Sequence, residues 1–190
     1  MAQLLLKRQG QPEIQNNIVE IIPIVSREEE VKSAYPIAEF RQRITKKTFG
    51  KYITLENSPV SPERFKGFHT GIDVEYEDVS GEVPVLAVCD GEIVLSKWVS
   101  GYGGVLILKC AENYYIYGHL KDSSITKNLN VLRGDQIGIL GEGQTQETDF
   151  ERKHLHFGIN KKSADLRGYV QNERELENWI DPLESDIYYE

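Results

Sequence analysis

The central part of the chain, from residue 49 to 159, alternates short apolar runs with turn-forming residues. The runs are four to seven residues long and fall at 83–88, 92–98, 105–110, 114–117 and 136–140. Gly and Asp separate them, as in Asp90-Gly91 and Arg133-Gly134-Asp135. Short β-rich runs with turn signals roughly every 8–12 residues are typical of antiparallel sheets. The pattern therefore predicts a mainly β fold, either an antiparallel β-sandwich or an open barrel.

The two ends of the chain follow a different pattern. Residues 1–48 hold an apolar run at 18–25 and the sequence Ser26-Arg-Glu-Glu29, which matches a helix capping box. We expect this segment to be a short N-terminal arm that packs on a main domain at 49–160. Residues 161–190 are charged, with a short helix candidate at 172–178 before the apolar sequence Trp179-Ile-Asp-Pro182-Leu. We expect a C-terminal helical tail there, with Trp179 as an apolar anchor.

Composition narrows the possible partners. The 190 residues carry a formal net charge of −8, with 39% hydrophobic and 27% charged residues, which is typical of a folded protein rather than a disordered one. An acidic chain is poorly suited to nucleic acid as its main partner, because phosphate binding needs a basic surface. The one basic cluster, at 41–47, is interpreted as a solvated face. No apolar run approaches the roughly 18 residues of a membrane span.

The first residues of this chain do not resemble an export signal. Met1-Ala-Gln-Leu-Leu-Leu-Lys7 is too short and wrongly flanked for a secretory signal. The expectation is that either the protein acts in the cytoplasm or this chain lacks its export sequence. Nothing in the sequence specifies an oligomeric state.

The two cysteines, Cys89 and Cys110, lie in apolar, strand-like runs. The CxxC spacing of a zinc site is absent, and two cysteines do not make a disulfide scaffold. Buried reduced thiols are the favoured interpretation. A disulfide stays open if the strands that hold the two residues are neighbours.

All four histidines fall in three short motifs: His69-Thr-Gly-Ile-Asp73, Tyr117-Gly-His119-Leu and His154-Leu-His156-Phe-Gly. Neutral imidazole is the commonest metal ligand in proteins and the usual acid or base near neutral pH. Imidazole and carboxylate without thiolate suit zinc, and three protein ligands leave one position for water. This use of every histidine indicates a zinc site, although the HExxH motif is absent.

Each motif also has a less specific interpretation. On a strand, His154 and His156 would share one face, about 6.5–7 Å apart, while Leu155 and Phe157 face the core. Both imidazoles could be ligands, or one could lie at the metal's open position. On a straight strand His69 and Asp73 would be roughly 13 Å apart, so they share an ion only if Gly71 lets the chain bend.

The third motif is the least specific of the three. Tyr115, Tyr117 and His119 would share a strand face, which alone would favour an aromatic patch that ends in a solvent-exposed histidine.

The chain resembles the lysostaphin/LytM-type zinc metallopeptidases, a peptidoglycan endopeptidase family, from residue 68 to 159. The matching motifs, with the family's order and spacing, are His69-x-x-x-Asp73, Pro84-Val-x-Ala-Val-x-Asp-Gly91, Gly101-Tyr-Gly103, Tyr117-x-His119-Leu, Gly134-Asp-Gln-Ile-Gly138 and His154-Leu-His156-Phe157. The resemblance implies a mostly antiparallel β fold with a groove walled by loops. It also implies a peptidoglycan substrate and a location outside the cytoplasm.

The resemblance also implies roles for individual residues. His69, Asp73 and His156 would bind one zinc ion per chain. His119 and His154 would be catalytic, flanking the attacking water and stabilising the oxyanion. Tyr117 is a weaker candidate for the substrate groove.

One departure from the family lies directly before His154. Arg152-Lys153 replaces the family's usual small, Gly-Pro-like step. These two cations are expected beside the groove, either paired with a substrate carboxylate or exposed to solvent.

The function expected from the sequence is zinc-dependent hydrolysis of peptide bonds in peptidoglycan cross-links or stem peptides. One alternative is a catalytically silent or regulatory module of the same fold that binds peptidoglycan or protein. Another is a cytoplasmic zinc peptidase that acts on other Gly-rich peptides.

Overall fold

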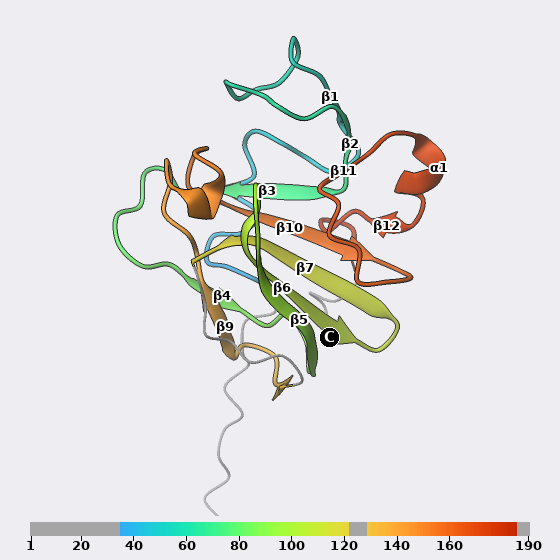
Figure 1. Cartoon of the computed structure of the whole chain (residues 1–190). Coiled ribbons are helices and arrows are strands. Elements are labelled where there is room, and N and C mark those ends of the chain that lie inside the picture. The colour runs from blue at the N-terminus through green and yellow to red at the C-terminus, as the bar shows by residue number, and fades with distance from the viewer. Residues whose placement is uncertain (1–34, 122–128, 186–190) are drawn as a thin grey trace, which may run out of the picture. The chain divides into compact units, whose positions relative to one another are not determined.

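Antiparallel strands form nearly all of the regular secondary structure in the computed structural model, which describes residues 35–121 and 129–185 (Figure 1). The largest sheet has seven strands. Its order is β12 (Trp179–Ile180), β10 (His154–Asn160), β7 (Asn113–Leu120), β6 (Gly103–Cys110), β5 (Gly91–Val99) and β8 (Asn130–Val131), and β3 (Gly71–Glu75) also pairs with β10. β10 is therefore bordered by β7 on one side and by β3 and β12 on the other.

Two smaller sheets and two short helices complete the described part of the chain. The three-stranded sheet contains β1 (Tyr52–Ile53), β2 (Gly67–His69) and β11 (Tyr169–Val170), and the two-stranded sheet contains β4 (Pro84–Leu86) and β9 (Gln136–Ile139). The helices are the 3₁₀ turn η1 (Gln146–Thr148) and α1 (Glu173–Leu176). None of the helices in the described ranges has the length or apolar character needed to cross a bilayer.

The mainly β, antiparallel prediction is confirmed. Each of the five apolar runs overlaps one of the strands β4, β5, β6, β7 and β9. None of the sheets formed by the described residues closes into a barrel. The C-terminal helix is real but minor, because α1 has four residues; the Asn172 side chain caps it by accepting a hydrogen bond from the Glu175 backbone N–H.

The main core lies on one face of the large sheet. Alternate residues of β10, Leu155 and Phe157, point into it and are fully buried. Ile37 and Phe40 also join this core, and the Phe40 ring lies edge-on to the Phe157 ring at 5.9 Å between centroids. Residues 35–48 thus contact the core, whereas the apolar run at 18–25 and the capping box at Ser26 lie outside the described residues.

A second apolar cluster lies on the opposite face of the same sheet. Along β6, Leu106 belongs to the main core while Val105 and Ile107 belong to this second cluster, as expected from the alternation of side chains along a strand. Trp179 completes the cluster and is 3% exposed. Trp179 is therefore the apolar anchor that was predicted. It belongs to β12, which pairs with the end of β10 and holds the C-terminal segment on the sheet.

The two cysteines form a disulfide, so the preference for reduced thiols is wrong. Cys89 and Cys110 are bonded with their Cα atoms 6.3 Å apart. Strand pairing is the reason: Glu92 of β5 is opposite Lys109 of β6, so the chain just before β5 meets the end of β6. The sequence left this possibility open but did not contain the register that decides it.

Removing the disulfide is expected to lower stability by about 3 kcal/mol, because the bond closes a loop of 21 residues in the unfolded chain. Urea unfolding with and without a reducing agent measures this difference. The Cys89→Ala/Cys110→Ala double variant is the control, since its midpoint must not respond to the reducing agent. An unchanged midpoint for the reduced wild-type protein would contradict the prediction.

Phe157→Ala is expected to destabilise the fold by about 3–5 kcal/mol, because it leaves a cavity in the main core. His154→Ala is expected to cost clearly less, since its side chain lies on the opposite face of β10 from the core. Thermal or urea unfolding of the two variants tests this difference. Equal losses would mean that the two faces of β10 do not differ as described.

Candidate metal centre and active site

The register between β3 and β10 sets the positions of four polar side chains. Asp73 is directly opposite His156, and Glu75 is directly opposite His154. Directly opposed residues of antiparallel strands have Cβ atoms about 4.5–5.5 Å apart, so the pairing places both acids close to the two imidazoles. Both histidines line a cavity while Leu155 between them is in the core. The predicted common face of His154 and His156 is thereby confirmed.

His69 reaches the same place because the chain bends between β2 and β3. The bend is at Thr70, which is fully buried and whose hydroxyl donates to the Arg167 carbonyl at 2.6 Å. Gly71 follows, where a Cβ atom would collide with the Phe157 carbonyl oxygen. His69 Nε2 therefore lies 3.3 Å from Asp73 Oδ1. The two residues are close enough to share one ion, as expected if the chain bends between them.

His119 reaches the cavity through an irregularity in β7. Gly104 of β6 is opposite Leu120 and Leu106 is opposite Tyr117, so two residues of β7 face one residue of β6, as in a β-bulge. His119 also has a positive φ of 61°. The alternation of side chains is broken there: Tyr117 points into the main core, and His119 lines the cavity.

Three candidate metal ligands place their donor atoms at nearly equal distances. His69 Nε2 and His156 Nδ1 are 3.1 Å apart, and they lie 3.3 Å and 3.2 Å from Asp73 Oδ1. Ligand atoms bound tetrahedrally to zinc at about 2.0–2.1 Å are separated by roughly 3.3–3.4 Å. The two imidazoles and the carboxylate therefore fit a zinc ion in both spacing and chemistry.

Backbone carbonyls fix the orientation of three imidazoles. The Nδ1–H groups of His69, His119 and His154 donate to the carbonyl oxygens of Thr48, Glu147 and Arg152, at 3.2, 3.3 and 2.8 Å respectively. The opposite nitrogen, Nε2, is left with its lone pair in all three rings. This arrangement selects the tautomer that a metal ligand or a base requires.

Burial and neighbouring groups shift the pKa values of three of the histidines and of Asp73. Burial lowers the pKa of His119 to about 3 and the pKa values of His154 and His156 below the ordinary range. Burial acts to raise the pKa of Asp73, but its interactions with His69, His154 and His156 hold that pKa well below its ordinary value. Neutral imidazoles beside an ionised carboxylate are the forms that bind a metal.

A cavity of about 400 Å³ connects all five of the residues predicted to bind metal or to be catalytic. The His119 and His154 rings lie 4.3 Å apart on its wall. The cavity is also lined by residues that were not predicted as site residues, among them Lys47, Tyr102, Glu151 and Tyr169. Of these four, only Tyr102 lies in a quoted motif, Gly101-Tyr-Gly103, which could have indicated it.

The three expected groove residues are not on the cavity wall. Tyr117 is fully buried in the main core, because the bulge separates it from His119. Arg152 and Lys153 are 5% and 4% exposed, and neither lines the cavity. Lys153 Nζ lies 2.9 Å from Glu142 Oε1 and donates to the Gly81 carbonyl, so neither expected role holds for it.

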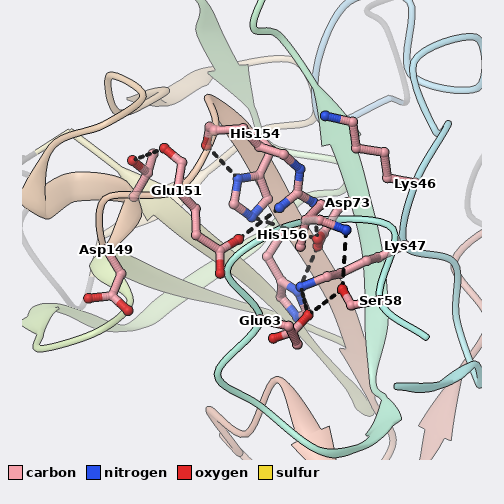
Figure 2. A network of polar contacts seen from close by, with 12 residues as sticks. Lys46, Lys47, Ser58, Glu63, Asp73, Asp149, Glu151, His154 and His156 are labelled. Atoms are coloured by element: carbon pink, nitrogen blue, oxygen red, sulfur yellow. Dashed lines mark hydrogen bonds and ion pairs between the residues drawn. The ribbon is translucent and has the colours of Figure 1, made fainter. Parts of the chain in front are cut away.

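The basic cluster at 41–47 is not uniformly solvated as expected. Lys47 is buried, and its ammonium group lies 2.7 Å from Glu63 Oε2 and 2.9 Å from the Tyr169 hydroxyl. Figure 2 shows Lys47, Glu63 and Ser58 together beside the histidines of the site. Ser58 donates a further hydrogen bond to Glu63 at 2.7 Å. This network ties the loop before β2 to the cavity wall.

Comparison with solved structures gives several similar proteins. LytU is 29% identical, with a TM-score of 0.51 over 74% of this chain and 81% of that one. The catalytic domain of the antimicrobial peptidase lysostaphin from Staphylococcus simulans is 22% identical, with a TM-score of 0.54 over 78% and 96%. The SpoIIQ–SpoIIIAH pore-forming complex contains a chain that is 20% identical, with a TM-score of 0.55 over 80% and 89%. The similarities to lysostaphin and to the chain of the SpoIIQ–SpoIIIAH complex show a common fold only.

Comparison by sequence identifies the family. None of the curated proteins matches the chain significantly. Residues 67–167, more than half of the chain, match the family described as peptidase family M23. This range begins at β2 and includes His69, Asp73, His119, His154 and His156. The resemblance to lysostaphin and LytM is therefore confirmed, and the chain belongs to peptidase family M23.

Proposed function

We propose that the protein is a zinc-dependent endopeptidase that hydrolyses peptide bonds in peptidoglycan cross-links or stem peptides. The observation that carries the proposal is the spacing of three donor atoms, from His69, Asp73 and His156, at 3.1–3.3 Å from one another. Membership of peptidase family M23 supports hydrolysis of a peptide bond as the reaction.

In this proposal His69 Nε2, Asp73 Oδ1 and His156 Nδ1 hold one zinc ion per chain. When bound, the ion supplies Lewis acidity, which lowers the pKa of a water molecule and polarises a carbonyl group. Each of these three residues belongs to a strand, so the backbone holds the ligand atoms in fixed positions. The cavity of about 400 Å³ beside them is the proposed place for the reacting part of the peptide.

His119 and His154 are the proposed catalytic residues. Both present Nε2 while Nδ1–H is held by a backbone carbonyl, and both line the cavity. One of them can accept a proton from the attacking water at Nε2, and the imidazolium that this transfer creates can then donate a hydrogen bond from Nε2–H to the developing oxyanion. The 4.3 Å between the two rings allows them to act on the same reacting group.

Removal of zinc tests the function directly. Protein stripped with a chelator is expected to release no fragments from purified peptidoglycan, and addition of one equivalent of zinc is expected to restore release. Chromatography of the soluble muropeptides measures the effect. A zinc-loaded protein that cleaves no cross-linked or stem peptide would overturn the proposal.

His154→Ala separates catalysis from metal binding. This variant is expected to bind zinc as the wild type does and to lose at least about 10²-fold in activity, because a general acid–base group is removed. His156→Ala is the matched control on the same strand and should lose both zinc and activity. Zinc content by elemental analysis and muropeptide release are measured together. Full biological function of His154→Ala would favour a binding or regulatory role instead.

A further inference from the structure

Arg152 contacts three carboxylates at once, and it is almost completely buried. Its Nη2 atom lies 2.6 Å from Asp73 Oδ2, its Nε atom lies 2.7 Å from Glu75 Oε2, and its Nη1 atom lies 2.8 Å from Glu151 Oε2. Arg152 is two residues before His154 and lies just outside β10, and its side chain reaches the two acids that are opposite His154 and His156. The guanidinium group provides N–H donors in a planar fork, which suits carboxylates arranged around it.

The two oxygens of Asp73 have different partners as a result. Oδ1 lies 3.2–3.3 Å from the donor nitrogens of His156 and His69. Oδ2 lies against Arg152 and is 3.7 Å from His154 Nε2. A charge-assisted hydrogen bond as short as that from Arg152 holds the carboxylate in one rotation. One oxygen is thus directed to the candidate metal centre, and the other is occupied by the arginine.

Arg152 also balances the charge of the acids that surround it. Asp73, Glu75 and Glu151 would repel one another in this buried region without a cation between them. Burial raises the pKa of Glu75 and of Glu151, and their interactions with Arg152 act in the opposite direction. The Lys46 ammonium is 3.8 Å from Glu75 and its side chain is 30% exposed, so it contributes less.

The backbone of Arg152 reaches a second residue of the site. Its carbonyl oxygen accepts the hydrogen bond from His154 Nδ1–H at 2.8 Å. One residue therefore orients both a candidate zinc ligand, through its side chain, and a candidate catalytic imidazole, through its carbonyl group.

We propose that Arg152 is a positioning residue that restricts Asp73 to coordinating zinc through one oxygen. This inference rests on the proposed zinc function. In the absence of the guanidinium group, Asp73 is free to rotate or to offer both oxygens to the metal, and the site loses its fixed four-ligand geometry. Partners that orient metal ligands in this way typically account for about 10–100-fold in metal affinity.

The test compares Arg152→Met with Glu75→Gln, using zinc and cobalt(II) as probes. Glu75→Gln disturbs the same buried cluster but leaves the Arg152–Asp73 contact in place. Zinc affinity is measured by competition with a chromophoric chelator, and visible absorption of the cobalt-loaded protein reports the coordination number, because four-coordinate cobalt absorbs much more strongly than five- or six-coordinate cobalt. Thermal melting of the metal-free variants records purely structural damage.

Arg152→Met is expected to bind zinc about 10–100-fold more weakly and to show weakened cobalt bands. Glu75→Gln is expected to melt at a lower temperature but to keep wild-type zinc affinity and cobalt bands. Wild-type values for Arg152→Met would overturn the inference, and so would an equal loss of affinity in Glu75→Gln. If Arg152→Met does not fold, Arg152→Lys decides, because it keeps the charge without the fork; wild-type affinity and bands in that variant would overturn the inference.

The outcome for the wild-type protein separates this inference from the proposed function. A wild type that binds zinc in the four-coordinate state but cleaves no peptide overturns the proposed hydrolase, and the role of Arg152 is still decided by the variants. A wild type that binds neither zinc nor cobalt overturns both.

Discussion

The antiparallel pairing of β3 with β10 is the constraint on which the site depends. It sets Asp73 against His156 and Glu75 against His154, and the period of two along each strand sends the residues between them into the core. The same pairing that buries Leu155 and Phe157 therefore presents the polar side chains on the opposite face. A shift of one residue in this register would exchange the two faces, so packing of the core and assembly of the site cannot be separated.

Buried charge is the second constraint. The buried charged side chains are compensated by oppositely charged side chains rather than by solvent. Arg152 lies among three acids, and Lys47 contacts Glu63 and Tyr169. Loss of one partner from such a pair leaves an uncompensated charge in the interior, which is far more costly than loss of an exposed ion pair. Both clusters border the candidate metal centre, where a bound cation would add two further positive charges.

Local sequence was sufficient for part of this picture. Alternation predicted the facing of His154 and His156, and a bend was expected between His69 and Asp73, although it lies at Thr70 while Gly71 belongs to β3. The errors concerned contacts between different segments of the chain instead. Tyr117 was expected in the groove because a bulge in β7 leaves no local signal, and the disulfide depends on the pairing of β5 with β6. Arg152 and Lys153 were expected near solvent or substrate because their acidic partners are up to 79 residues away in sequence.

The bulge at His119 has a consequence for how this fold can change. His119 points into the cavity because two residues of β7 face one of β6 there and because it has a positive φ. Deletion of one residue at the bulge would restore regular alternation and alter the direction of that imidazole, whereas the pairing of β3 with β10, which sets Asp73 against His156, does not involve β7. The position of His119 and the positions of the three candidate zinc ligands therefore depend on different strand pairings, so a small deletion at the bulge can remove one proposed catalytic imidazole and leave the candidate metal centre in place.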